Sequence, residues 1–259
     1  MIECPVDHPE LPKLFNPQVP NNAALWAVFE GRHAGRALVD DPHHPTQCVL
    51  RTEAVLTYAS QRVSQEFLAD AIGHFRKTGR IWLIRSQGDP LAPEGYRNLP
   101  RLEFYEYDPH SPVLADLRSR LPGGTMMCQI DKSLLERCEW RDDMAFYSGS
   151  QENFLKNDVG MCLMYGEEII VEAYACPLGS SYAEIGAITH EPYRGRGFAP
   201  IAVAYLIELL EQRGYQAYWS CDVDNPASAS VARKLGFKVE RPYEILEYGP
   251  ALESKHFPE

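Results

Sequence analysis

The stretch EIGAITHEPYRGRGFA, residues 184–199, predicts a β-strand that runs through a short loop into a helix. Its first six residues read as a buried strand, whereas Gly195 and Gly197 are typical of a turn. From Phe198 to Gln212 the apolar residues recur at helical spacing, and Gly214 ends that segment. The stretch therefore places a glycine-containing loop at the amino end of a helix.

This loop has the properties of an anion site. The first N–H groups of a helix have no partner within the helix, and the helix dipole puts partial positive charge there. Gly195 and Gly197 allow the backbone to approach a ligand closely, while Arg194 and Arg196 add full positive charges. A diphosphate group would be well held at such a position.

Other interpretations of the loop must be weighed. A dinucleotide-binding G-x-G-x-x-G fingerprint would need a glycine where Pro200 stands, and it would belong in the first strand–helix unit of the chain. A Walker A loop is excluded, since no Gly-Lys-Ser/Thr follows. A tight strand-to-helix turn that binds no ligand would also use glycines. The loop alone therefore does not distinguish these possibilities, and the neighbouring segments are needed to do so.

A second segment, NPASASVARKLGF at residues 225–237, follows about thirty residues later and predicts a helix over Pro226–Leu235. Strands are predicted on both sides of the two helices. They cover Val159–Met164, Ile169–Ala175, Ala183–Thr189, Ala217–Cys221, Phe237–Glu240 and Tyr243–Glu247. The order from residue 150 is thus β-β-β-α-β-α-β, which indicates an α/β fold with a mixed sheet rather than a doubly wound parallel one.

Together, these motifs resemble the GCN5-related N-acetyltransferases (GNAT). The pattern Arg194-x-x-Gly197-x-Ala199 is similar to the acyl-CoA-binding Q/R-x-x-G-x-G/A of that family, and Asn225 with the ending Lys234-x-Gly236-Phe237 is similar to its second motif. Residues 153–247 resemble in particular the subgroup that includes the zwittermicin A resistance acetyltransferase. The resemblance implies the GNAT acyl-CoA N-acyltransferase fold in the C-terminal half.

The resemblance also implies how acetyl-CoA is held. In this family a splay between the central strand and its neighbour admits the pantetheine arm. The backbone positions that would bond the arm are Ala187, Ile188 and Thr189, and the loop that would hold the diphosphate is Arg194, Gly195, Arg196, Gly197, Phe198 and Ala199. Asn225 either bonds the pantetheine or caps the following helix, and Ser228 either points to acetyl-CoA or is an exposed helix serine.

Acetyl transfer needs a neutral amine, so a base is useful. Glu184, on the central strand where some members of the family keep a catalytic glutamate, is the candidate base, and His190 in the following loop is a weaker rival. The family's tyrosine that protonates the leaving thiolate is replaced here by Ala232. Either another group, such as Ser228 or a nearby tyrosine, then serves, or the thiolate leaves without help.

The chain is expected to divide into an N-terminal α/β region, residues 1–130, and a catalytic domain, residues 131–259. The order of elements in the first region is similar to that of a GNAT unit, but the region has no R-x-x-G-x-G/A loop. It is expected to be either a degenerate GNAT-like unit that shapes the acceptor pocket or an independent regulatory domain. Its expected elements are helices over Ala23–Glu30, Ser64–Lys77 and Val113–Leu121, and strands over Arg36–Val39, Gln47–Arg51, Ala54–Tyr58, Ile81–Ile84, Leu102–Tyr107 and Thr125–Ile130. Residues 87–100 are expected to be loop and 131–158 a broken helical stretch.

Composition limits the possible partners and location. The 259 residues carry a formal net charge of −11 without a lysine or arginine run, so nucleic acid is not expected as a partner. The seven cysteines form no C-x-x-C pair, no signal peptide or membrane span is recognisable, and a cytoplasmic protein is expected. No metal is expected: His43 and His44, near Asp40 and Asp41, lie in a proline-bounded turn. Cys221 lacks a histidine base and reads as a core thiol.

The resulting hypothesis is an enzyme that moves an acetyl group from acetyl-CoA to the amine of a small molecule by direct attack in a ternary complex. The acidic composition favours a cationic amine. The alternative is a non-catalytic acyl-CoA-binding or sensing module of the same fold, which the absence of a tyrosine at Ala232 keeps open. A protein-binding scaffold is a third class, and the oligomeric state is left open.

Overall fold

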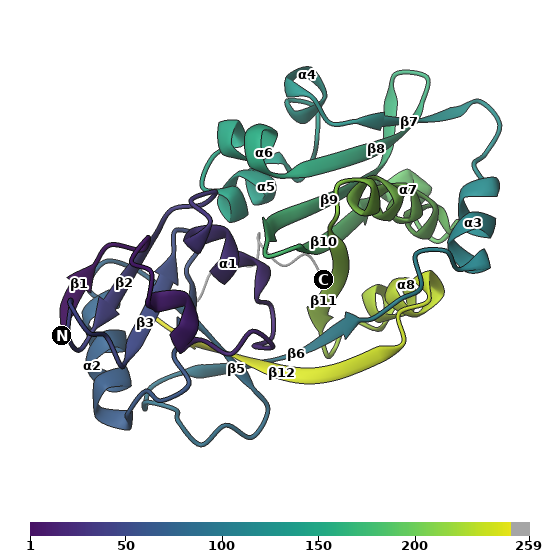
Figure 1. Ribbon diagram of the computed structural model, residues 1–259. Coiled ribbons are helices and arrows are strands. Elements are labelled where there is room, and N and C mark those ends of the chain that lie inside the picture. The colour runs from purple at the N-terminus through teal and green to yellow at the C-terminus, as the bar shows by residue number, and fades with distance from the viewer. Residues whose placement is uncertain (250–259) are drawn as a thin grey trace. The chain divides into compact units, whose positions relative to one another are not determined.

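A computed structural model describes residues 1–249 of the chain (Figure 1). The described residues form two compact units: one comprises residues 1–101 and 242–249, and the other comprises Leu102–Arg241. The boundary between the two units lies between Arg101 and Leu102, whereas the expected domain boundary lies between residues 130 and 131. The two differ because the elements from Leu102 to Gln129 pack with the second unit. The last strand returns the chain to the first unit.

The first unit begins with four antiparallel strands. Its elements are β1 (Ile2–Cys4), η1 (Leu11–Leu14), α1 (Ala23–Phe29), β2 (Gly35–Val39), β3 (Cys48–Thr52), β4 (Leu56–Ala59), α2 (Gln65–Phe75) and β5 (Ile81–Ser86). Strands β1 to β4 pair antiparallel in chain order, β5 lies parallel to β4, and Tyr243–Tyr248 of the last strand pair antiparallel with β5. The expected helices and strands of residues 23–84 are therefore present, with ends shifted by a few residues.

The second unit contains the predicted order β-β-β-α-β-α-β. It begins within β6 (Arg97–Tyr105) and ends within β12 (Val239–Tyr248), whose other parts belong to the first unit. Between them lie α3 (Pro112–Ser119), β7 (Thr125–Gln129), α4 (Lys132–Leu135), α5 (Arg141–Ser148), α6 (Gln151–Asn157), β8 (Val159–Tyr165), β9 (Glu168–Gly179), β10 (Tyr182–Thr189), η2 (Glu191–Tyr193), α7 (Phe198–Gln212), β11 (Gln216–Asp222) and α8 (Pro226–Leu235). Strands β7 to β10 pair antiparallel in chain order, and β11 lies parallel to β10.

The same connectivity thus occurs twice in one chain. Four antiparallel strands, a helix and a parallel fifth strand appear as β1–β4, α2 and β5, and again as β7–β10, α7 and β11. The difference lies in the loop between the fourth strand and the helix. In the first unit it is short, Ser60–Ser64, whereas the second unit carries the arginine- and glycine-containing residues 190–197. The first unit therefore has the expected GNAT-like element order without the loop that contains arginine and glycine.

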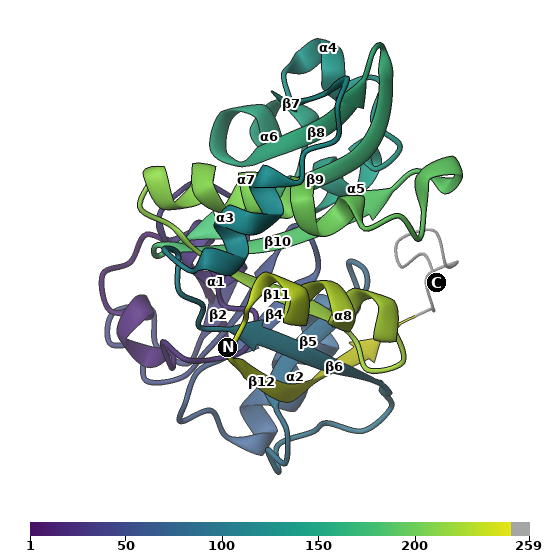
Figure 2. The same ribbon diagram turned by 90° about the vertical axis from the view of Figure 1, so that its right-hand side faces the viewer.

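The sheet of the second unit is covered on both faces, and β9 shows this residue by residue. Val171, Ala173 and Ala175 belong to one apolar cluster, whereas Tyr174 and Cys176 belong to the other. Because strand side chains alternate in direction, the two clusters lie on opposite faces of the sheet. Helix α7 packs on β8–β11 and contacts α3 and α8 on the first face, and α5 packs on β9 at the second (Figure 2).

Helices α7 and α8 have the predicted bounds because both carry strong end signals. Helix α7 starts directly after Gly197, whose φ of 78° lies in the left-handed region. Pro200 lies in the first turn of the helix, where a backbone N–H makes no hydrogen bond within the helix, so the N–H that proline lacks is not needed. Asn225 caps α8, and Gly236 follows it at φ 87°. These signals act locally, so they can be recognised from sequence.

Several predicted strand bounds are wrong. The two short strands expected at Phe237–Glu240 and Tyr243–Glu247 are one strand, β12, since Pro242 removes only its own N–H donor. Strand β6 begins at Arg97 and includes Pro100, so the preceding loop is shorter than expected. The three-residue β1 was not predicted, because the proline- and asparagine-rich start of the chain carries no strand pattern.

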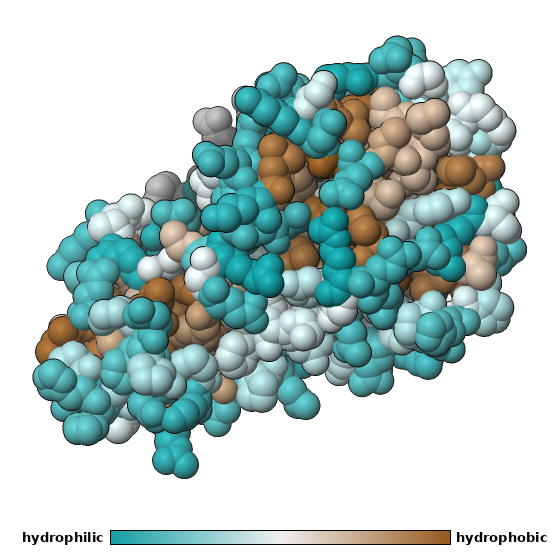
Figure 3. All heavy atoms as spheres, turned by 45° about the horizontal axis from the view of Figure 1, so that its top comes forward, coloured by the Kyte–Doolittle hydropathy of each residue, from teal (hydrophilic) through white to brown (hydrophobic). Residues whose placement is uncertain are grey.

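The surface is consistent with contact with water. On the face drawn in Figure 3 polar residues predominate, and apolar residues lie in separate patches. Among the residues that the structure describes, no helix has the length and apolar character needed to cross a membrane.

Candidate functional site

Strands β10 and β11 of the second sheet are paired over only part of their length, and the unpaired stretch between them is called the cleft below. The two strands pair from Tyr182–Gln216 to Ile185–Trp219, and no further pairs follow, although both strands continue. The opposite edge of β10 remains paired with β9 as far as Thr189. Residues 186–189 are half-buried although their strand is central. At Ala187, Ile188 and Thr189 the edge of β10 that points away from β9 therefore has no pairing with β11.

The loop from His190 to Gly197 follows directly on this edge of β10. Gly195 and Gly197 have φ of 74° and 78°, where an L-residue is strained, and a Cβ at either position would meet nothing within 4 Å. The requirement for glycine is therefore conformational, and the space above the loop is open. Phe198 and Ala199 form the first turn of α7, and Gly197 is its N-cap without a side-chain cap.

The two arginines of the loop are both exposed but differ in their contacts. Arg194 Nε donates to the backbone oxygen of Thr189 at 3.1 Å and so ties the loop back to the end of β10. The Arg196 guanidinium lies 5.6 Å from the centre of the Tyr193 ring, a cation–π contact at the surface. The loop directly before α7 thus carries the positive charges of Arg194 and Arg196, next to the helix end whose dipole is positive.

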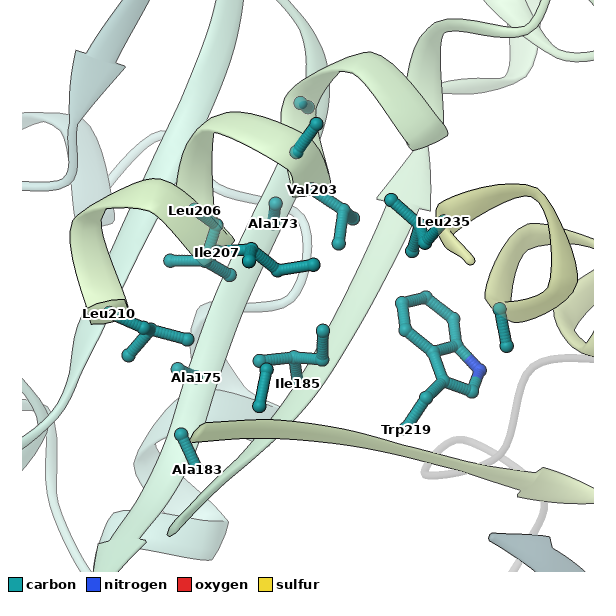
Figure 4. Packing of buried hydrophobic residues seen from close by; sticks show 14 of the residues in the cluster. Ala173, Ala175, Ala183, Ile185, Val203, Leu206, Ile207, Leu210, Trp219 and Leu235 are labelled. Atoms are coloured by element: carbon teal, nitrogen blue, oxygen red, sulfur yellow. The ribbon is translucent and has the colours of Figure 1, made fainter. Parts of the chain in front are cut away.

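Asn225 and Ser228 have structural partners. The Asn225 Oδ1 accepts the N–H of Ser228 at 2.9 Å, which is a helix cap, and Trp219 Nε1 donates to Ser228 Oγ at 2.9 Å. Figure 4 shows the Trp219 indole directed from β11 toward Leu235 of α8. The cap interpretation of Asn225 is therefore realised, and a contact of either residue with acetyl-CoA stays a prediction.

Glu184 lies where β10 is irregular. It is in register with Tyr218 of β11, while on the β9 side the register shifts between Ala183 and Ile185. Its carboxylate contributes to the raised pKa of both Tyr174 and Cys176. The candidate base thus faces the side of the sheet that α5 covers, and it is half-buried.

His190, the rival base, is held in an ion pair. Its Nε2 lies 2.7 Å from a carboxylate oxygen of Glu172, which has no exposed side-chain surface. The hydrogen bond that the His190 ring donates to the Glu172 carboxylate is the main cause that raises the pKa of His190 above its ordinary value, and Glu139 adds to it. Glu172 also accepts the backbone N–H groups of Glu139 and Trp140. A histidine stabilised in its protonated form is a poor base, so this contact disfavours His190 in that role.

Sequence reasoning missed Tyr174 and Glu172. Both lie on β9, whose residues from Ile169 onward are all buried. Two polar residues at alternate positions of an otherwise apolar strand could have indicated them, because a buried polar side chain normally has a hydrogen-bond partner or a functional role. Ala232, at the position of the family's tyrosine, is fully buried in the apolar cluster beneath α7.

His43 and His44 lie in a turn that the side chains of Asp40 and Asp41 stabilise. Asp41 Oδ1 accepts the backbone N–H groups of His43 and His44, and the Asp40 carboxylate accepts those of Thr46 and Gln47. Within residues 1–249, no group of three or more histidine, cysteine, aspartate or glutamate side chains could hold a metal ion. Cys221 is buried in the core of the second unit.

Comparison with known proteins places this architecture among acetyltransferases. A family model described as GNAT acetyltransferase matches residues 13–246. The chain is 24% identical over 238 residues to the uncharacterized N-acetyltransferase YdfB of Bacillus subtilis (strain 168), covering 87% of this chain and 90% of that protein.

Solved structures share the fold. A GCN5-related N-acetyltransferase-like protein from Streptococcus suis matches with a TM-score of 0.65 and 24% identity, over 92% of this chain and 97% of that one. A GCN5-related N-acetyltransferase from Sphaerobacter thermophilus matches with a TM-score of 0.60 and 15% identity, over 95% of both chains. A tandem GNAT protein from the clavulanic acid biosynthesis pathway matches with a TM-score of 0.60 and 13% identity, over 90% of this chain and 89% of that one.

Proposed function

We propose, from the premise that this chain belongs to the GNAT acetyltransferase family, that it moves an acetyl group from acetyl-CoA to the amine of a small molecule. The amine attacks directly while both substrates are bound. The observation that carries the proposal is the loss of pairing between β10 and β11 beyond Ile185 and Trp219, next to a glycine loop at the amino end of α7. A cleft lined by strand backbone suits an amide-rich arm, and the loop suits a diphosphate.

The residues present fit acetyl-CoA. The pantetheine amides would bond the backbone at Ala187, Ile188 and Thr189, in the manner of an added strand. The diphosphate would lie on the N–H groups of residues 194–199, where the open space above Gly195 and Gly197 leaves room for it. Arg194 and Arg196 would neutralise its charge, and Asn225 and Ser228 would border the arm from the start of α8.

Glu184 is the proposed base. The acceptor arrives as an ammonium ion and must lose a proton before its nitrogen can attack the thioester carbonyl carbon. Glu184 is half-buried and lies one residue before the last β10–β11 pair, so it stands beside the closed end of the cleft. The thiolate of coenzyme A is a fair leaving group, so a buried alanine at position 232 is compatible with turnover.

The acceptor is proposed to be an amino-containing metabolite or antibiotic, in keeping with the resemblance to the zwittermicin A resistance subgroup. A location in the cytoplasm, where acetyl-CoA is available, belongs to the same proposal. The alternative, a non-catalytic acyl-CoA-binding module, rests on Ala232 of α8, which provides no hydroxyl at the position of the family's tyrosine.

The test is to incubate the purified chain with acetyl-CoA and a panel of polyamines, aminoglycosides and amino acids, while free thiol release is followed. Calorimetric titration with acetyl-CoA runs in parallel. Turnover on at least one amine is the expected result. Binding without turnover on any amine would support the non-catalytic module, and absence of binding would overturn both.

A further inference from the structure

Tyr174 of β9 lies across β10 at Gly186. A Cβ built on Gly186 would stand 2.9 Å from both the Cζ and the hydroxyl oxygen of Tyr174. Gly186 is the first residue of β10 beyond the last pair with β11, which is Ile185–Trp219. The Tyr174 hydroxyl therefore lies at the point where the cleft begins, on the face of the sheet opposite α7.

The side chain of Tyr174 is largely enclosed, but its hydroxyl oxygen is not one of the fully buried side-chain atoms that lack a partner. The residue is only 8% exposed, and its ring packs against Trp140 with a centroid distance of 5.8 Å. The structure shows no hydrogen bond from residues 1–249 to this hydroxyl, so its oxygen is in contact with solvent. A tyrosine whose ring is buried while its hydroxyl reaches solvent is able to hydrogen-bond a ligand there.

The charges around Tyr174 are negative. Burial is the largest cause that raises the pKa of Tyr174, and the carboxylates of Asp143 on α5 and Glu184 on β10 add to it. Asp143 is itself buried. The Tyr174 phenol thus stays protonated at neutral pH, in surroundings that favour a positively charged ligand.

We infer that Tyr174 contacts the acceptor, and that the acceptor is a cationic amine which approaches from the face covered by α5. The inference rests on the proposed function and names the substrate class of the same site. The absence of a side chain at Gly186 lets the Tyr174 hydroxyl lie directly over the backbone of β10, next to its unpaired stretch. Asp143 and Glu184 compensate the positive charge of the incoming ammonium group.

The proton balance assigns separate tasks to Glu184 and Tyr174. The ammonium ion gives one proton to Glu184, and its nitrogen lone pair then forms the C–N bond at the thioester carbonyl carbon. The C–S bond breaks, and sulfur leaves with the electron pair. The nitrogen releases a second proton, one proton ends on sulfur and one goes to water. Tyr174 exchanges no proton; its oxygen accepts an N–H hydrogen bond and so directs the lone pair toward the carbon.

The test uses Tyr174→Phe in the full chain, with the amine that wild type acetylates best. We expect kcat/KM for the amine to fall about 10-fold or more, as for loss of a hydrogen bond to a charged group, while the Kd for acetyl-CoA is unchanged. Tyr165→Phe is the matched control, because Tyr165 is 55% exposed at the end of β8. It should behave as wild type in both measurements.

A second variant tests the charge. Two acceptors of similar size are compared, one of which carries a second positive charge. Wild type should prefer the dication, and Asp143→Asn should reduce that preference several-fold while circular dichroism and acetyl-CoA affinity stay the same.

The outcomes separate the inference from the function on which it rests. If wild type turns over but Tyr174→Phe has the same kcat/KM for the amine, the contact is overturned and the function stands. A wild-type preference for neutral acceptors would overturn the cationic substrate class. Wild type that binds acetyl-CoA without acetylating any amine would overturn both the function and the contact.

Discussion

The half-buried imidazole of His190 and the buried carboxylate of Glu172 form an ion pair, with 2.7 Å between Nε2 and Oε1. It joins the start of the glycine loop to β9, because His190 is the residue directly after β10. Glu139 lies 3.5 Å from the other ring nitrogen, and Arg194 opposes the charge. The pair therefore connects the protonation of one histidine to the geometry of the candidate diphosphate loop.

The stability contributed by this pair should depend on pH. The pKa of His190 is raised in the folded protein, so the folded state binds more protons than the unfolded chain between the two pKa values. The contribution is fully present below the unfolded pKa and is lost as the pH rises through the folded one. We expect the difference in unfolding free energy between wild type and His190→Gln to shrink as the pH rises from 5 to 9, as urea unfolding would measure. A difference independent of pH would contradict this, and the exposed His110→Gln provides the control.

Gly197→Asp should greatly weaken acetyl-CoA binding. An aspartate there adds bulk and negative charge in front of the α7 amino end, and its backbone would be strained by about 1–2 kcal/mol at φ 78°. Calorimetric titration measures the loss. Gly166→Asp is matched, since Gly166 also has positive φ and open space but lies in the β8–β9 hairpin; equal affinities of the two variants would remove the loop as the diphosphate site.

Glu184→Gln should lower kcat by roughly 10²-fold, the contribution typical of a general base, and leave the Kd for acetyl-CoA intact. The loss should be largest at low pH, where little of the acceptor is already neutral. A pH–rate profile identical to that of wild type would exclude Glu184 as base. The exposed Glu53→Gln controls for the loss of one negative charge.

Gly186→Ala should destabilise the protein through Tyr174. The new Cβ would overlap the ring, and overpacking of this kind costs about 1–3 kcal/mol. In a Tyr174→Ala background the same change should cost less, so a double-mutant cycle measured by urea unfolding should show coupling. Gly73→Ala in α2, where a Cβ meets nothing within 4 Å, should instead stabilise. Additive effects at positions 186 and 174 would disprove the contact.

Asn225 can be tested for its two roles separately. Asn225→Ala should lose the cap of α8 at a cost of about 1 kcal/mol, whereas Asn225→Asp should keep the cap. If Asn225 also bonds pantetheine through its amide N–H, Asn225→Asp should weaken acetyl-CoA binding without loss of stability. Unchanged affinity of Asn225→Asp would leave only the cap.

Much of the site's framework could be predicted because its signals are local. The bounds of α7 and α8 follow from Gly197, Gly214, Asn225 and Gly236, which end or begin helices by their own backbone preferences. The pairs Tyr174–Gly186 and Glu172–His190 could not be predicted. Their members lie on different strands or beyond them, and only the β9–β10 register brings them together.

By itself, the sequence determined the order of the elements in the second unit and the position of the glycine loop, because periodicity and end residues act over a few neighbours. The tertiary structure alone decided where β10 and β11 part and which face of β10 carries Glu184. It also decided that a tyrosine lies over Gly186. Strand pairing and burial depend on residues distant in sequence, so the acceptor side of the site emerges only from the folded chain.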